Sequence, residues 1–116
     1  MSEHNKISYI EIPTKDIAAT KTFFSNVFGW TFQDFGPDYT SFTNEGSNGG
    51  FFKSDQTVST KNGSVLIVLY SNNLEQTLFN IKSEGGAIIK PIFPFPGGRR
   101  FHFSDPNGNE YAVWSE

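Results

Sequence analysis

The sequence contains no cysteine, which excludes a disulfide framework, a thiolate nucleophile and a cysteine-ligated metal site. Cationic residues are also few, since 9 Lys and Arg stand against 12 Asp and Glu and leave a net charge of −3. A nucleic-acid surface needs a basic stripe, so we expect no nucleic-acid partner. No apolar run approaches the roughly 18 residues of a membrane-spanning helix, and the first residues do not resemble a signal peptide. We therefore expect no membrane partner and a cytoplasmic location.

Leucine is scarce as well, with 4 residues against 13 phenylalanines, so aromatic rings should form much of the core. The length of 116 residues suits one domain, which we predict over residues 1–116.

The first half of the sequence predicts a strand, a helix and three more strands. Residues 6–12 alternate as a strand does, and Pro13 ends the pairing. A helix is expected between the N-cap Asp16 and Gly29, with an apolar stripe formed by Ile17, Thr20, Phe24, Val27 and Phe28. Turn residues then separate three further expected strands, at 30–35, 39–44 and 49–52.

The second half repeats this plan after a polar stretch, 54–63, which we predict to be a linker. A strand is expected at 64–70, followed by a helix that Asn72 or Asn73 caps and Gly85-Gly86 ends. Its apolar face comprises Leu74, Thr77, Leu78 and Ile81. A loop at 94–98 and a turn at 105–108 separate the last expected strands, 87–93, 99–103 and 110–115.

The two halves align at an offset of 57, which places Asp16 on Asn73 and Thr20 on Thr77. The sequence therefore predicts an α+β fold of two tandem βαβββ units, residues 6–53 and 64–115. Eight strands exceed the four of a ferredoxin-like domain, and two helices are too few for a doubly wound sheet.

Strand alternation predicts which side chains face away from the helices. Helices must bury their apolar stripes against one face of each sheet, so Ile10 and Ile12 suit the covered face. Tyr111 and Val113 suit it in the last strand. The opposite face then receives Tyr9, Glu11, Leu66, Val68, Tyr70, Glu110, Ala112 and Trp114. If the sheets curl, this face lines a concavity suited to a small molecule.

Three stretches resemble one known family. They are YIEIPTKD at 9–16 leading into TFFSNVFGW at 22–30, IKSEGG at 81–86, and FHFSDPNGN at 101–109. In this order and spacing they resemble the glyoxalase, bleomycin-resistance and extradiol-dioxygenase superfamily, also called vicinal oxygen chelate proteins. The likeness is greatest to the branch related to lactoylglutathione lyase. The resemblance implies a curved eight-stranded cup and a homodimer.

The resemblance also implies a divalent metal, held by His, Gln or Glu from the first strand of each unit and by Glu from the last. The matching positions here are Tyr9, Leu66, Gly50 or Phe51, and Ala112. Such side chains are poor ligands or none, whereas metal-assisted catalysis needs about three protein ligands and an open position. We therefore expect no metal and no other cofactor.

The remaining polar residues leave alternatives open. Glu11 is either a carboxylate in an apolar cup, able to act as a base or bind a cation, or a solvated group at the rim. His102 is either a proton shuttle or ligand contact, or a structural histidine. Glu110, beside a turn, is expected to face solvent. The run 97–100 is expected to be a loop tip with two solvated arginines rather than an anion cradle. Phe93 and Phe95 suit a lid, the core or a dimer contact equally.

The sequence thus predicts a protein that binds a small aromatic or amphipathic molecule. The ligand-facing residues would be Tyr9, Glu11, Phe51, Leu66, Val68, His102, Ala112 and Trp114, with stacking on the aromatic ones. The alternative is a lyase, isomerase or dioxygenase, with Glu11 and His102 as candidate catalytic residues. It would use either Glu11 as a proton-transfer base or a shifted metal set of Glu11, His102 and Glu110. A third possibility is an interaction module without a ligand.

Overall fold

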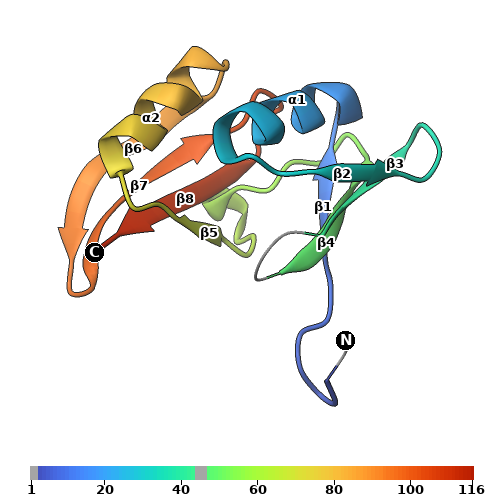
Figure 1. Cartoon of the computed structure of the whole chain (residues 1–116), viewed down its shortest axis with the longest axis horizontal. Coiled ribbons are helices and arrows are strands. Elements are labelled where there is room, and N and C mark those ends of the chain that lie inside the picture. The colour runs from blue at the N-terminus through green and yellow to red at the C-terminus, as the bar shows by residue number, and fades with distance from the viewer. Residues whose placement is uncertain (1–2, 44–46) are drawn as a thin grey trace. The chain divides into compact units, whose positions relative to one another are not determined.

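The computed structural model describes residues 3–43 and 47–116, and within them it contains eight strands and two α-helices (Figure 1). The chain forms two compact units, one ending at Gln56 and the other running from Thr57 to Glu116. Each unit has the order strand, helix and three strands, which confirms the predicted α+β fold of two βαβββ units. That the two units form a single domain stays a prediction.

The first unit builds one four-stranded sheet in the order β1-β4-β3-β2. Strand β1 pairs with β4 in parallel, and the other neighbours are antiparallel. The pairing continues through Pro13 to Thr14, so the expectation that Pro13 ends it is wrong. The parallel pair needs a crossover, which contains the helix. The elements are β1 (Ile10–Thr14), α1 (Ile17–Phe28), β2 (Phe32–Asp34), β3 (Tyr39–Thr43) and β4 (Asn48–Lys53).

Helix α1 begins and ends where the sequence predicts. The Asp16 side chain accepts a hydrogen bond from the Ala19 amide at 3.0 Å, and Gly29 ends the helix with a φ of 74°. Phe24 is fully buried on the sheet side of the helix. Its ring centroid lies 4.8 Å from that of Trp30 and 5.5 Å from that of Phe51. Aromatic rings therefore form the core of this unit, as the abundance of phenylalanine predicts.

The second unit repeats the topology, with the sheet order β5-β8-β7-β6 and a parallel β5–β8 pair. The hairpin of β6 and β7 is longer than predicted. Of the expected loop at 94–98, only residues 96 and 97 lie outside the two strands. Strand β5 is shorter than predicted, because it begins at Ile67. The elements are the 3-10 helix η1 (Thr60–Asn62), β5 (Ile67–Tyr70), α2 (Leu74–Ser83), β6 (Ala87–Phe95), β7 (Gly98–Ser104) and β8 (Glu110–Ser115).

Helix α2 covers one face of this second sheet (Figure 1). Asn73 caps it by accepting a hydrogen bond from the Gln76 amide at 3.1 Å. Leu74 and Ile81 are its buried residues. The core of the unit also contains Phe101, Phe103, Tyr111 and Val113, all fully buried or nearly so. Tyr111 and Val113 were predicted to point this way, which leaves the alternate residues of β7 and β8 for the open face.

One polar contact recurs in both units at the offset of 57. The Thr14 hydroxyl lies 2.7 Å from that of Thr20, and the Ser71 hydroxyl lies 2.7 Å from that of Thr77. Each pair joins the end of a first strand to the first turns of the helix that follows. The repeat of architecture predicted from the sequence therefore includes a specific hydrogen bond.

Neither α1 nor α2, the two α-helices in the described part of the chain, is long and apolar enough to span a bilayer.

Candidate functional site

The face of the second sheet turned away from α2, called the open face below, brings four predicted site residues together. Val68 is exposed there and Trp114 is partly exposed, whereas His102 and Ala112 are buried, at 4% and 0% exposure. In the register, His102 pairs with Ala112, and Val68 pairs with Ala112 from the other side. Trp114 lies two residues along β8, where it pairs with Arg100 and Tyr70. Because paired residues point to the same side of a sheet, Val68, His102, Ala112 and Trp114 share one face. Leu66 has the same alternation as Val68 but lies just before β5.

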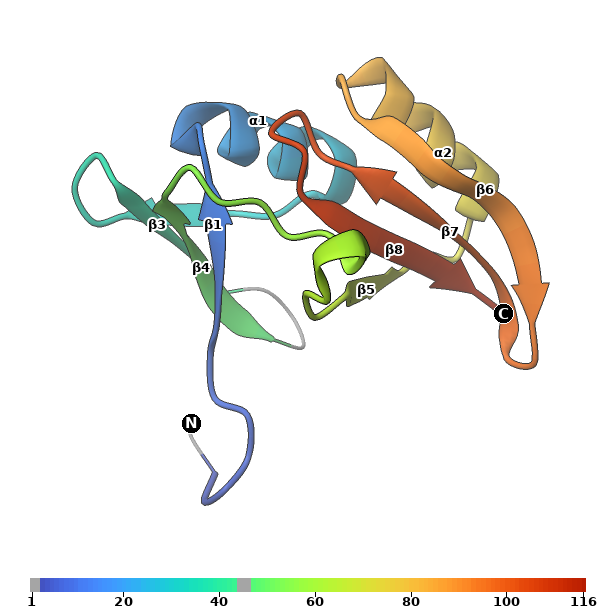
Figure 2. The ribbon, with the colours of Figure 1, turned by 180° about the vertical axis from the view of Figure 1, so that it is seen from behind.

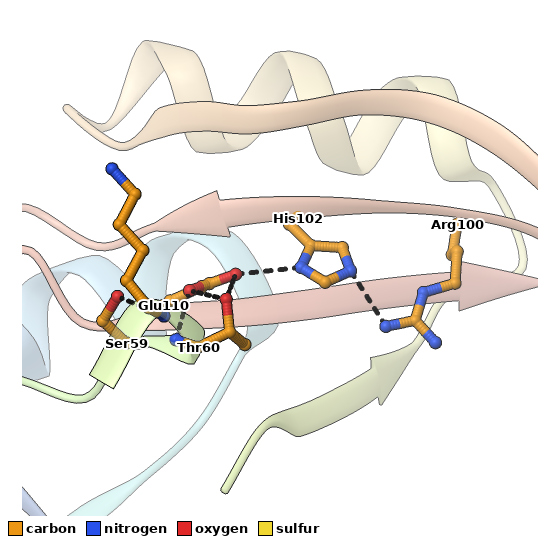
Figure 3. Close-up of polar contacts among 6 residues, drawn as sticks. Ser59, Thr60, Arg100, His102 and Glu110 are labelled. Atoms are coloured by element: carbon orange, nitrogen blue, oxygen red, sulfur yellow. Dashed lines mark hydrogen bonds and ion pairs between the residues drawn. The ribbon is translucent and has the colours of Figure 1, made fainter. Parts of the chain in front are cut away.

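A chain of hydrogen bonds crosses this face (Figure 3). The Nη2 atom of Arg100 lies 2.9 Å from His102 Nε2, and His102 Nδ1 lies 3.0 Å from Glu110 Oε2. Glu110 in turn accepts hydrogen bonds from the backbone amide of Thr60 at 2.8 Å and from its hydroxyl at 2.9 Å. Arg100, His102, Glu110 and Thr60 thus form one connected polar system.

The segment before β5 completes this system, although the sequence predicted it to be a linker. The Val58 amide donates to Asn109 Oδ1 at 2.8 Å, and the Glu110 amide donates to the Val58 carbonyl at 2.9 Å. Ser59 then caps η1 by accepting a hydrogen bond from the Lys61 amide. In Figure 2 η1 lies beside β8, so this segment is a structural part of the second unit.

Glu110 is buried, so the prediction that it faces solvent is wrong. Its side chain is only 4% exposed, because η1 covers it and supplies hydrogen bonds to its carboxylate. Burial raises the pKa of Glu110, but the hydrogen bonds from His102 and Thr60 outweigh burial and hold that pKa below its usual value. Glu110 is therefore an anion stabilised by its neighbours.

The hydrogen-bond pattern also fixes the tautomer of His102. An arginine only donates, so Arg100 must donate to Nε2 of the imidazole. The Nδ1–H then donates to Glu110, and the geometry is that of a neutral ring. With Nε2 engaged in this way, His102 has no free nitrogen for a proton from another molecule. His102 thus positions Arg100 in the structure as it stands.

Aromatic rings surround the guanidinium of Arg100. Its Cζ atom lies 5.7 Å from the ring centroid of Phe93 and 5.9 Å from that of Phe95. Phe95 also contacts Trp114, which contacts Tyr70 in an edge-to-face arrangement at 5.0 Å. The structure thus gives Phe93 and Phe95 a contact that the sequence did not predict, with this cation, and the choice among a lid, the core and a dimer contact stays open.

Arg100 is a site residue that the sequence reasoning missed. The expectation of a loop tip with two solvated cations is wrong for the tip, because β7 begins at Gly98. Arg99 is partly exposed and forms an ion pair with Glu75 at 2.6 Å. Arg100 is not a solvated cation, because its guanidinium is partly buried and contacts His102. The signal was available, since Arg100 and His102 are two residues apart in one strand and so share a face.

The first unit carries a different polar group on its open face. Tyr39 donates a hydrogen bond to Glu11 Oε2 at 3.1 Å, and its hydroxyl lies 2.6 Å from that of Tyr9. Burial and these two partners raise the pKa of Tyr39 above its usual value. Glu11 itself is exposed. Tyr9 and Glu11, predicted to share this face, are therefore linked through Tyr39.

Phe51 does not belong to that face, so its predicted role in ligand stacking is wrong. It pairs with Ile12 in the parallel register, and its fully buried ring packs on Phe24 of α1. Gly50 pairs with Glu11 and takes the outward position. A Cβ atom at Gly50 would lie 2.5 Å from Cζ of Tyr39, so the ring of Tyr39 occupies the space above this glycine.

The residues at the positions that would hold a metal do not fit one. The outward positions of the inner strands are Gly50 and Ala112, which have no donor atoms, and the register pairs them with Glu11 and Val68. Within residues 3–43 and 47–116, no three His, Cys, Asp or Glu side chains gather in a group able to hold a metal ion. In the shifted set, His102 and Glu110 already hydrogen-bond each other.

Several solved structures share the fold at low sequence identity. A glyoxalase-related enzyme from Fulvimarina pelagi matches with a TM-score of 0.80 at 15% identity, over 97% of this chain and 88% of that chain. A mutant of the fosfomycin resistance protein FosX from Listeria monocytogenes, complexed with Mn(II) and a dihydroxypropylphosphonic acid, gives 0.80 at 20% identity over 97% and 91%. A lactoylglutathione lyase from Agrobacterium tumefaciens gives 0.70 at 16% identity over 98% and 96%.

A comparison with curated proteins finds no match. Residues 6–113, which include the three motif stretches and both βαβββ units up to the middle of β8, match the family model described as Glyoxalase/Bleomycin resistance protein/Dioxygenase superfamily. The resemblance predicted from the sequence is thereby confirmed, and the chain belongs to the glyoxalase, bleomycin resistance protein and dioxygenase superfamily.

Proposed function

We propose that this protein binds a small aromatic or amphipathic molecule, without a metal ion, on the open face of its second sheet. The observation that carries the proposal is the Arg100–His102–Glu110–Thr60 hydrogen-bond chain, bordered by aromatic rings. Small-molecule sites combine a largely apolar lining with a few fixed polar groups, and this face has both. Tyr70 and Val68 of the same face are about half exposed, at 50% and 43%, and so offer apolar surface to a ligand.

The donor set supports binding without a metal. The outward side chains of β4 and β8 at the relevant register are Gly50 and Ala112, which leave at most the exposed Glu11 in the first unit as a ligand. A catalytic metal normally needs about three protein ligands. Elemental analysis of protein purified without a His-tag tests this point. Stoichiometric Ni, Zn, Fe or Mn that resists dialysis would contradict it.

Thermal-shift screening against aromatic metabolites and antibiotics tests the binding itself. A ligand that binds only the native state raises stability by about 2.7 kcal/mol at a hundredfold excess over Kd. The matched control is a Trp114→Ala variant, which removes one ring of the face and should lower the shift for any aromatic ligand that stacks there. Equal shifts in both proteins would place the ligand elsewhere.

A proton-transfer enzyme is the second candidate, and the buried contact between His102 and Glu110 favours it. A carboxylate that orients an imidazole is a common general-base arrangement. In this candidate a substrate would displace Arg100 from His102 Nε2 and leave that nitrogen able to accept a proton. Turnover of a bound ligand that disappears in His102→Gln, while binding persists, would establish the enzyme. Binding without turnover in the wild type would favour the first proposal.

The homodimer implied by the family remains a prediction. Sedimentation velocity over a range of protein concentrations would test it directly.

A further inference from the structure

Arg100 has more hydrogen-bond donors than the second unit uses. A guanidinium carries five N–H donors. Arg100 uses one of them, from Nη2 to His102, and its Nε atom is buried without a partner. Buried polar groups are nearly always paired in native structures, so an unpaired one indicates a missing acceptor. Arg100 is thus incompletely satisfied in the structure of the chain alone.

The charge of Arg100 is also uncompensated by a direct ion pair. Arg99, the next residue, holds Glu75 with two hydrogen bonds at 2.6 and 3.3 Å. Arg100 contacts neutral His102 instead, and the carboxylate of Glu110 behind that ring is already engaged by His102 and Thr60. Lys90 pairs with His102 in the register and so adds a second cation to the same face. The face carries one further carboxylate, Glu116, which accepts a hydrogen bond from Tyr70 at 2.7 Å. The end of the face at Arg100 therefore favours an anion.

The aromatic side chains beside Arg100 indicate what kind of molecule carries the anionic group. The Arg100 guanidinium lies against Phe93 and Phe95, and Phe95 leads to Trp114 and Tyr70 through ring contacts. A planar aromatic body can stack on such rings while a group on its edge reaches the guanidinium. The cation and the rings are close enough for one small molecule to touch both.

We propose that the ligand of this face is an aromatic carboxylate, and that Arg100 binds its carboxylate group. The planar fork of a guanidinium matches the two oxygens of a carboxylate, and such charge-assisted hydrogen bonds are among the strongest in proteins. His102 holds the guanidinium from one side and leaves its remaining donors for the ligand. This inference rests on the proposed binding function and adds the chemical class of the ligand.

The test compares an acid with its neutral amide on the purified full chain. Titration calorimetry with 2-naphthoate and 2-naphthamide keeps the aromatic body constant and removes only the negative charge. The acid should bind at least about tenfold more tightly, because hydrogen bonds to charged groups contribute about 1.5–3 kcal/mol. Equal affinity for the two compounds would overturn the carboxylate inference and leave the proposed binding function standing. Absence of binding by both compounds would count against both proposals.

Variants of the two adjacent arginines locate the anion. Arg100→Gln should bind 2-naphthoate about tenfold or more weakly than the wild type does. Its affinity for 2-naphthamide should be unchanged. Arg99→Gln is the matched control, since it removes an exposed arginine on the opposite face and should bind 2-naphthoate as the wild type does. Should Arg100→Gln fail to fold, Arg100→Lys retains the charge without the fork and should still weaken acid binding. An unchanged affinity in the folded Arg100 variant would place the anion elsewhere and overturn the inference.

Discussion

Phe24 and Ile81 occupy corresponding positions in the two units, 57 residues apart, and each is fully buried between a helix and a sheet. Around Phe24 the neighbours are aromatic, with Trp30 and Phe51 within 5.5 Å between ring centroids. The second unit gives the same position an aliphatic residue. The hydroxyl bridge before the helix and the strand register are nevertheless the same in both. The topology therefore tolerates a ring or an aliphatic side chain at this helix position, although the second core has aromatic rings of its own on β7 and β8.

The open faces differ more than the covered ones. In the first unit an exposed carboxylate, Glu11, accepts a hydrogen bond from Tyr39. In the second, a buried carboxylate, Glu110, stands behind His102 and Arg100. The first group is acidic and the second presents a cation. A repeat can thus keep its folding contacts while each copy acquires its own surface chemistry.

The largest expected effect tests the contrast between the cores. Phe24→Ala should lower the free energy of unfolding by about 3–5 kcal/mol, because it removes the ring on which the core of the first unit packs. Ile81→Ala, at the corresponding position, removes less buried volume and should lose about 2–3 kcal/mol. Urea unfolding of both variants measures the difference. A larger loss for Ile81→Ala would break the comparison.

The second prediction contrasts two acids by the direction of their pKa shifts. Burial raises the pKa of Asp105 from 3.8 to about 6, although backbone amides and Tyr111 donate to it. The folded state therefore binds the Asp105 proton more tightly than the unfolded state does. This contribution to the free energy of unfolding is fully present below about pH 3.8 and is lost as pH rises through 6, by about 3 kcal/mol in all. Asp105→Asn should remove this loss. Unfolding free energies at pH 4, 5, 6 and 7 should therefore favour the variant increasingly toward pH 7.

Asp34 is the matched acid of the first unit. Its hydrogen bond with Lys21 lowers its pKa, so any stability it provides is present above its unfolded pKa and is lost as pH falls. Asp34→Asn should therefore change the pH profile only at the acidic end. If the unfolding free energies of wild type and Asp105→Asn depended on pH in the same way, Asp105 would not be a buried carboxyl with a raised pKa.

The third prediction compares the two carboxylates of the open faces. Glu110→Ala removes the acceptor of the His102 Nδ1–H and of the Thr60 amide. An unpaired buried donor costs about 1–3 kcal/mol, and Thr60 itself is exposed, so water can satisfy its amide in part. We therefore expect a loss of about 2–3 kcal/mol. Glu11→Ala should change stability by less than about 0.5 kcal/mol, because the residue is exposed. Thermal unfolding of both variants at pH 7 gives the comparison. Similar losses would show that burial does not distinguish the two sites.

The smallest expected effect concerns the two outward positions that lack donor atoms. In Gly50→Ala the new Cβ would collide with the Tyr39 ring and lie 2.9 Å from the Thr40 carbonyl oxygen. Displacing that ring should break its hydrogen bonds with Tyr9 and Glu11, at a cost of about 1–2 kcal/mol. Ala112→Gly, the opposite exchange, should lose about 0.5–1 kcal/mol. A neutral Gly50→Ala variant would show that Tyr39 moves freely.

Much of the fold follows from local signals in the sequence. The cap Asp16 and the stop at Gly29 agree with prediction, and Asn73 is one of the two caps predicted for the second helix, because each acts through side-chain or backbone geometry within a few residues. The alternation of β8 was also correct, since Tyr111 and Val113 are apolar at a period of two. These signals suffice for element order and for which face a helix covers.

The site was less predictable because it depends on contacts between distant residues. Glu110 was expected in solvent, but Thr60, 50 residues earlier, covers it and donates to it. Nothing in the polar stretch 54–63 indicates that it packs on β8. Phe51 was misplaced for a smaller reason: the choice between Gly50 and Phe51 is a shift of one residue, which exchanges the two faces of a strand.

The strand order delays the pairing of each sheet during synthesis. In both sheets the strand that is synthesised last, β4 or β8, lies inside the sheet between strands made earlier. On the ribosome, β5 and β7 must therefore wait for β8 before either has its full set of partners. Thr60 emerges 50 residues ahead of the carboxylate it binds, so the polar network closes only when translation of the unit is nearly complete. A nascent chain arrested before Glu110 would carry the arginine and the histidine without the acid that orients them.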